Sequence, residues 1–138
     1  MNIIEKIREQ IQEAVEKALE KTGFGTTNVE IEIPADRKNG DFSVNTAMKL
    51  TKKEKKPPRE IATAIVDAIE TDGTYIDKIE IAGPGFINFY LNDLWRYDGL
   101  KSVLEEGEKF GKTTVGNGKK VMVEFVSANP TGPMHMGN

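Results

Sequence analysis

The sequence contains no cysteine, which excludes disulfide bonds and thiolate chemistry. A chain of this kind suits a reducing compartment, so we expect a cytoplasmic protein. Long apolar runs are also missing, because no stretch approaches the roughly 18 apolar residues of a membrane span. The amino terminus, MNIIEKIREQ, is charged and amphipathic and is not typical of a signal peptide. We therefore expect no membrane partner.

The sequence also lacks an excess of positive charge. Its net charge is −3, whereas dedicated nucleic-acid-binding domains are usually basic. The positive charges are nevertheless concentrated in one stretch, where Glu54 is the only acid. Two interpretations stay open: a solvated helix end followed by a loop, or a surface for an anionic partner. The basic residues are Lys49, Lys52, Lys53, Lys55, Lys56 and Arg59.

The spacing of apolar residues predicts an α+β fold with an antiparallel sheet of about four strands packed with helices. Strands 75–82 and 86–92 flank Gly83-Pro84-Gly85 and predict a hairpin. The 86–92 strand is unusual, because its second face carries aromatic and amide side chains instead of charges. The other predicted elements are helices over 2–21, 42–50, 58–69 and 94–106 and a strand over 29–33.

The segment KVMVEFV, residues 120–126, differs from the earlier strands because it is apolar at nearly every position. This pattern is typical of a strand buried on both faces of a parallel sheet. No crossover helix follows it, so we interpret it as the first strand of a second domain. Because an exposed apolar strand tends to pair with a sheet edge, we expect 120–126 to be disordered, folded back on the first domain or paired with a second copy in a dimer. The expected organisation is a domain over 1–92, a linker helix and loop over 93–119, and the start of a second domain over 120–138.

The stretch VEFVSANPTGPMHMGN, residues 123–138, resembles the first signature of class I aminoacyl-tRNA synthetases in the form found in arginyl-tRNA synthetases. The preceding region resembles the additional domain that stands before the catalytic core in this family. The resemblance implies that 120–138 opens a Rossmann-like catalytic domain. The motifs that carry the second likeness are Gly40-Asp41-Phe42, Ala47-Met48-Lys49-Leu50, Pro58-Arg59-Glu60-Ile61-Ala62 and Gly83-Pro84-Gly85-Phe86-Ile87-Asn88-Phe89.

The resemblance assigns ATP-binding and catalytic roles to the end of the chain. His135 and Gly137 match the first and third members of the His-x-Gly-His tetrad, which stabilises the transition state at the α-phosphate. Asn138 stands where histidine is usual, and its amide can donate a hydrogen bond but cannot become cationic. The matched signature positions are Ala128, Asn129, Pro130, Thr131, Gly132, Pro133, His135, Gly137 and Asn138.

The same resemblance implies three substrates. Glu124, Ser127 and Asn129 match residues that hold arginine, since their oxygens can accept from an ammonium group. ATP would arrive with Mg²⁺ as its counter-ion, and no metal site of the protein's own is expected. The third substrate is the arginine-accepting tRNA, whose D-loop the additional domain contacts in this family.

The residues matched to tRNA binding lie on the strand after Gly83-Pro84-Gly85. Phe86 and Tyr90 are suited to stack on unpaired bases, and Asn88 is suited to read a base edge. The alternative is that both aromatic rings cover the sheet while Asn88 satisfies a backbone group. The lysines expected to attract phosphate are Lys52, Lys53 and Lys55.

We therefore expect the N-terminal fragment of an arginine–tRNA ligase that is inactive by itself and contacts the D-loop. Two other hypotheses stay open, namely a free-standing RNA-binding module and a protein-interaction domain.

Overall fold

The computed structural model describes residues 2–136. The chain divides into two units, Met1–Glu105 and Glu106–Asn138. None of the helices within the described range has the length and apolar character needed to cross a membrane. The elements in chain order are α1 (Ile3–Thr22), β1 (Ile31–Glu32), η1 (Arg37–Asn39), β2 (Phe42–Val44), α2 (Thr46–Glu54), α3 (Pro58–Ala68), β3 (Ile76–Ala82), β4 (Phe86–Leu91), α4 (Leu94–Glu106) and η2 (Gly107–Lys109).

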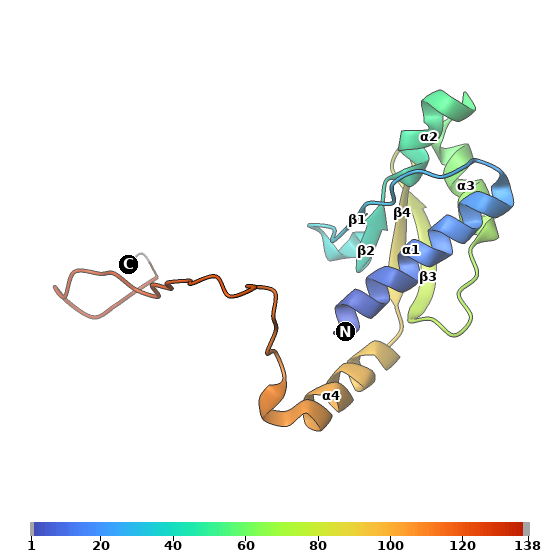
Figure 1. Cartoon of the computed structure of the whole chain (residues 1–138). Coiled ribbons are helices and arrows are strands. Elements are labelled where there is room, and N and C mark those ends of the chain that lie inside the picture. The colour runs from blue at the N-terminus through green and yellow to red at the C-terminus, as the bar shows by residue number, and fades with distance from the viewer. Residues whose placement is uncertain (1, 137–138) are drawn as a thin grey trace. The chain divides into compact units, whose positions relative to one another are not determined.

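The first unit is an antiparallel sheet of four strands in the order β1-β2-β4-β3, with helices α1 and α3 packed on one face (Figure 1). Alternation along β4 points Ile87 and Phe89 into the core, where both side chains are fully buried. The predicted α+β class and the hairpin between β3 and β4 are therefore confirmed. The helices contribute Ile7, Ile11, Val15, Leu19, Ile61 and Ile65 to the same core.

Helix α1 forms where the sequence predicts a long amphipathic helix. Asn2 caps its start, and the Asn2 and Glu5 side chains each accept from the other's backbone N–H in a capping box. Gly23 ends the helix with φ of 75°, a conformation that glycine adopts without steric cost. Local sequence signals alone therefore account for both ends of α1.

The segment expected to be a short helix over 42–50 is instead strand β2 followed by α2. Residues Phe42–Val44 pair with β4, and Asp41 extends this pairing because Leu91 N donates to its carboxylate at 2.9 Å. A strand of this length carries too little periodicity to distinguish it from a helix. Its stability comes from β4, which lies far away in the sequence. Strand β1 is likewise shorter than the predicted 29–33.

Two glycines allow backbones to approach closely around β4. Gly40 has φ of 89°, and a Cβ placed there would lie 2.7 Å from the carbonyl oxygen of Phe89. Gly85 has φ of 145°, and its Cβ would lie 3.0 Å from backbone atoms of Pro58. These positions explain why glycine stands in the Gly40-Asp41-Phe42 and Gly83-Pro84-Gly85 motifs.

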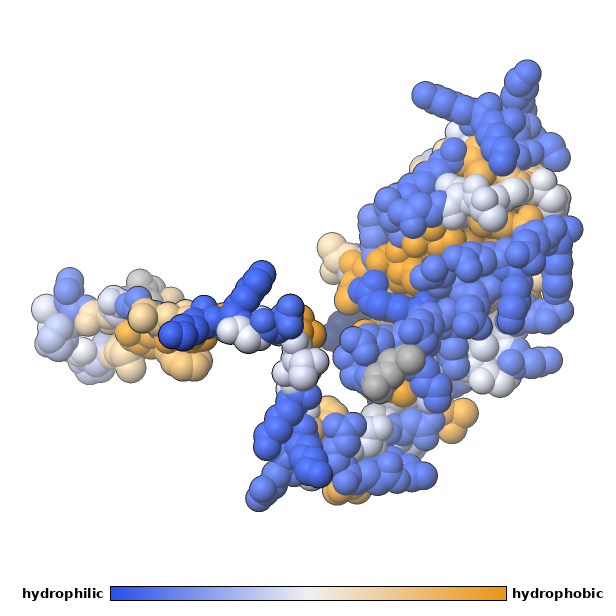
Figure 2. Space-filling view, in the orientation of Figure 1, coloured by the Kyte–Doolittle hydropathy of each residue, from blue (hydrophilic) through white to orange (hydrophobic). Residues whose placement is uncertain are grey.

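The second unit forms no strand within its described residues, so the expected strand over 120–126 is absent from this fold. A strand requires a neighbour for its backbone hydrogen bonds, and this unit supplies none. The apolar side chains of the segment are exposed, with Val121 77%, Val123 65% and Phe125 92% accessible. Figure 2 shows hydrophobic atoms at the surface of this extended segment.

Candidate nucleic-acid interface

The sheet face that points away from the helical core is where the predicted RNA-binding side chains gather. Phe86, Asn88 and Tyr90 alternate with the core residues of β4 and share this outer sheet face. The strand register adds Ser43 from β2 and, from β3, Lys78 and Glu80. Ser43 lies opposite Asn88 on one side, while Glu80 and Lys78 lie opposite Asn88 and Tyr90 on the other.

Asn88 occupies the centre of the outer sheet face and is only 3% exposed. Its Oδ1 accepts a hydrogen bond from Ser43 Oγ at 2.8 Å. Its Nδ2 makes no hydrogen bond to any group within residues 2–136, so both N–H donors of the amide stay available. The oxygen thus bonds to a side chain of the neighbouring strand and not to a backbone group, while the nitrogen makes no such bond.

Tyr90 is part of a compact polar cluster with Glu80 and Lys78. The Tyr90 hydroxyl lies 2.9 Å from Glu80 Oε2 and 2.7 Å from the carbonyl oxygen of Lys38. Lys78 Nζ contacts Glu80 at 2.8 Å and lies 4.3 Å from the centroid of the Tyr90 ring. One face of the ring therefore already carries a cation.

The cluster shifts the pKa of each of its members. The hydrogen bond to the Glu80 carboxylate raises the pKa of Tyr90, because it favours the protonated hydroxyl. The hydrogen bond from Lys78 lowers the pKa of Glu80, and the same contact raises the pKa of Lys78. Glu80 is thus held as a paired carboxylate, which reduces its repulsion of an anionic ligand.

Phe86 begins β4 beside the turn that contacts α3. Its ring is partly exposed on the outer sheet face, and Arg59 donates to the carbonyl oxygen of Gly83 in the same turn. A partly exposed aromatic ring on a sheet surface is suited to stack on an unpaired base. Phe86 and Tyr90 are therefore the two aromatic residues of β4 with partly exposed rings, since Phe89 is buried.

The predicted lysines all lie near the C-terminal end of α2 and are exposed. Lys53 Nζ donates to the carbonyl oxygen of Phe24 at 3.1 Å, so it also ties α2 to the end of α1. Lys52 and Lys55 make no side-chain hydrogen bond or ion pair inside the described range. Lys53 is therefore held by a hydrogen bond, whereas Lys52 and Lys55 are available to bind an anion.

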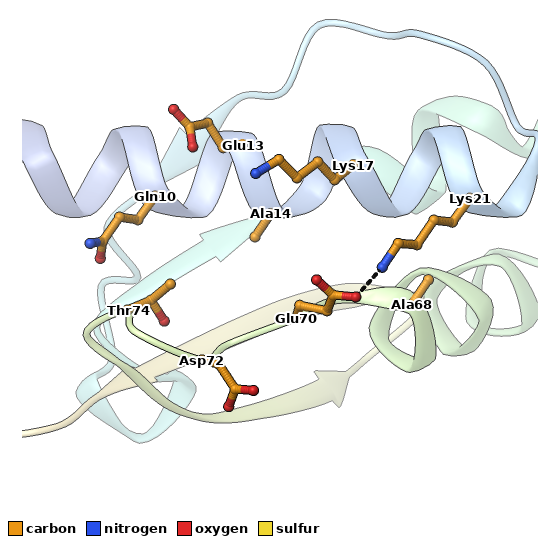
Figure 3. Close-up of a pocket in the computed structure, with 9 residues that line it drawn as sticks. All are labelled: Gln10, Glu13, Ala14, Lys17, Lys21, Ala68, Glu70, Asp72 and Thr74. Carbon is orange, nitrogen blue, oxygen red and sulfur yellow. Dashed lines mark hydrogen bonds and ion pairs between the residues drawn. The ribbon is translucent and has the colours of Figure 1, made fainter.

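A small pocket lies on the other side of the molecule, between α1 and the connection from α3 to β3 (Figure 3). Lys21 and Glu70 form an ion pair across it, and the hydrogen bond from Lys21 lowers the pKa of Glu70. Carboxylates outnumber cations around it, so the pocket does not suit a phosphate. The residues that line it are Gln10, Glu13, Ala14, Lys17, Lys21, Ala68, Glu70, Asp72 and Thr74.

The residues matched to arginine and ATP binding are not assembled into a site. Glu124, Ser127 and Asn129 are exposed and lie in the part of the second unit without regular structure. His135 is also exposed, whereas Gly137 and Asn138 lie outside the described residues. No group of three His, Asp or Glu side chains suited to a metal ion occurs in the described part of the chain.

Comparison with known proteins identifies the first unit. A family model described as the arginyl-tRNA synthetase N-terminal domain matches residues 5–91. The chain belongs to this family. The match spans α1 to β4 and so contains the whole outer sheet face.

Curated relatives of this arginyl-tRNA synthetase N-terminal domain are named arginine–tRNA ligases. The one from Acetivibrio thermocellus is 47% identical over 99% of the chain and 26% of its own length. The one from Ruminiclostridium cellulolyticum is 58% identical over 81% of the chain and 20% of its own length. The chain thus spans about a quarter of the relatives it matches.

Two solved structures share the fold. Arginyl-tRNA synthetase from Plasmodium falciparum superposes with a TM-score of 0.59 at 22% identity, covering 75% of this chain and 18% of that one. The Thermus thermophilus arginyl-tRNA synthetase gives 0.55 at 24% identity, covering 72% and 15%. At this identity the likeness concerns the fold alone.

The sequence predicted that Phe86, Asn88 and Tyr90 share one face of the strand, but it did not predict the side chains beside them. Ser43 and Lys78 reach the outer sheet face only through the pairing register of β4 with β2 and β3. The motif Gly40-Asp41-Phe42 was the one available signal for β2, and it was assigned to the start of a helix.

Proposed function

We propose that this chain acts as the tRNA-binding N-terminal part of an arginine–tRNA ligase and that it contacts the D-loop through the outer sheet face. The observation that carries the proposal is the grouping of a partly exposed Phe86, Asn88 Nδ2 and Tyr90 on one strand, with Lys78 on the neighbouring strand β3. Stacking on an aromatic ring and hydrogen bonding to a base edge are the usual means of reading single-stranded RNA. The family match supports this assignment.

The whole enzyme would join arginine to its tRNA in two steps. ATP and arginine give arginyl-adenylate with release of pyrophosphate. A terminal ribose hydroxyl of the tRNA then attacks the carbonyl carbon of the adenylate, and AMP leaves as the ester bond to the tRNA forms. Residues 120–138 belong to this proposal as the first strand and signature of a Rossmann-like catalytic domain. The Acetivibrio alignment, which reaches 99% of the chain, supports including them.

ATP is a substrate in this proposal, and the donor types suit it. The Asn129 amide and the His135 imidazole, both in the matched signature, can each donate to phosphate oxygens. Both side chains are exposed in the described part of the chain. Mg²⁺ would arrive on the phosphates, since the described part of the chain offers no carboxylate cage.

The chain should therefore bind tRNA without activating arginine. We expect no ATP–pyrophosphate exchange above a buffer control, with or without tRNA. Measurable exchange would contradict the assignment of an incomplete site.

Binding is tested by titrating the chain with arginine-accepting tRNA and with the same tRNA carrying a substituted D-loop. We expect salt-dependent binding that weakens when the D-loop is changed or when Phe86 is replaced by alanine. Loss of one stacked base corresponds to about 1–3 kcal/mol of binding free energy.

The pocket variant Lys17→Ala is the matched control and should bind normally. Indifference to RNA would favour a protein-interaction domain, and binding that ignores the D-loop would favour a general RNA-binding module.

A further inference from the structure

The loop that enters β2 is held against the end of β4. The Tyr90 hydroxyl lies 2.7 Å from the carbonyl oxygen of Lys38, at the middle of η1. Asp41 N donates to the carbonyl oxygen of Phe89 at 2.9 Å, and the buried Gly40 allows this close approach. The loop Asp36–Asp41 is thus attached to the sheet at both its middle and its end.

The acidic and basic side chains of this loop differ in their contacts. The carboxylate of Asp36 accepts from Lys38 N at 3.0 Å, and the carboxylate of Asp41 accepts from Leu91 N. Both acids are therefore engaged with backbone amides. The side chains of Arg37 and Lys38 are exposed, and neither makes a hydrogen bond or ion pair within residues 2–136.

This arrangement differs from that of three lysines in the first unit that are paired with carboxylates, and it resembles that of Lys52 and Lys55. Lys49 pairs with Glu30 at 2.9 Å, Lys21 pairs with Glu70, and Lys78 pairs with Glu80. Arg37 and Lys38 instead project from a fixed backbone beside the outer sheet face. A guanidinium and an ammonium at adjacent positions suit the phosphate groups of a nucleic-acid backbone.

We propose that loop Asp36–Asp41 is a phosphate-binding arm of the RNA interface, in which Arg37 and Lys38 contact phosphate and Tyr90 positions them. This inference rests on the proposed function. It adds that one edge of the site binds the phosphate groups of the RNA. Tyr90 acts here through its hydroxyl, which supports the loop, and stacking of its ring on a base is not required. Phe86 lies four residues away on β4, about 13 Å along the strand, so base and phosphate contacts fall at opposite ends of one surface.

The first test measures the affinity for arginine-accepting tRNA at several salt concentrations. Removing both cations in Arg37→Ala/Lys38→Ala should reduce the slope of log K against log salt by about 1.4, since each single-strand phosphate contact accounts for about 0.7. The control Lys109→Ala/Lys112→Ala removes the same charge from exposed positions elsewhere and should leave the slope unchanged. Equal slopes for the two double variants would overturn the phosphate-binding arm.

The second test separates positioning from stacking. Tyr90→Phe keeps the aromatic ring and loses the hydroxyl. We expect faster hydrogen–deuterium exchange at the amides of residues 38–41 without RNA, together with weaker tRNA binding. Unchanged exchange and unchanged affinity would overturn the role of Tyr90. If the unmodified chain binds no tRNA, the proposed function fails and the arm fails with it. If binding depends on Phe86 but not on Arg37 and Lys38, only the arm fails.

Discussion

Asn88 serves the sheet and the proposed interface with different atoms. Its oxygen is committed to Ser43, and its nitrogen is the only part of the amide left for an external acceptor. Burial at 3% means that an RNA base would have to approach the sheet closely to meet it. This geometry favours recognition by a flat, unpaired base over contact with a bulky duplex.

The link between Ser43 and Asn88 predicts a measurable coupling in stability. Ser43→Ala leaves a buried amide oxygen without its donor, which should lower the free energy of unfolding by about 1–3 kcal/mol. Asn88→Ala should cost a similar amount, and the double variant should cost about 1 kcal/mol less than the sum. Urea denaturation of the four proteins measures this coupling. Strict additivity would show that the hydrogen bond contributes nothing to the fold.

At the residue scale, the sequence identified which side chains of β4 face away from the core but not what they touch. Alternation along one strand is a local property, so the placement of Phe86 beside Asn88 and Tyr90 could be predicted. The contacts of Tyr90 with Lys38 and of Asn88 with Ser43 depend on the register between distant strands. Local periodicity contains no information about that register.

Helix α4 is attached to the first unit by few contacts. None of its side chains is fully buried, although Trp95 packs against the core. The Tyr75 hydroxyl donates to the Asp98 carboxylate at 2.7 Å, and Tyr75 is itself buried in the unit. This hydrogen bond raises the pKa of Tyr75, because the neighbouring carboxylate favours the protonated hydroxyl.

The Tyr75–Asp98 contact should make stability depend on alkaline pH. Because the folded-state pKa of Tyr75 is raised, its contribution is complete below the unfolded-state pKa of about 10 and is lost as pH rises through the folded value. Tyr75→Phe should cost about 1 kcal/mol at pH 8, and this difference should shrink above pH 10. Urea denaturation across that range measures it. A difference that does not change with pH would contradict the contact.

The apolar segment 120–126 predicts self-association of the chain. Its exposed side chains and unpaired backbone favour pairing with a second copy. Sedimentation should therefore show a concentration-dependent dimer that is weakened by Val123→Lys/Phe125→Lys. The matched control Val115→Lys changes an exposed valine outside the segment and should not affect association. A monomer at all accessible concentrations would contradict the prediction.

At the element scale, predictions succeeded where the signal was long and local. The periodicity and caps of α1 define the helix by themselves. Strand β2 was missed because three residues pair with a strand more than forty positions away. The 120–126 pattern predicts a strand, yet an isolated segment cannot form one without neighbours.

The whole molecule combines a folded unit that matches a family with a second unit that carries signature residues but no assembled site. The match to residues 5–91 concerns the first unit alone. Residues of the second unit, such as Ser127 and His135, would bind substrates only within the larger ligase that we propose. The function that we propose for this chain by itself is therefore RNA binding by the outer sheet face.

The most direct test of this central claim is chemical-shift mapping of the isotope-labelled chain during titration with arginine-accepting tRNA. The account predicts that shifts concentrate on the outer sheet face and its loop, at residues 36–41, 78–80 and 86–90. The lining of the pocket between α1 and the α3–β3 connection, such as Glu13 and Asp72, should change little. Shifts that gather at this pocket and leave β4 unchanged would contradict the proposal.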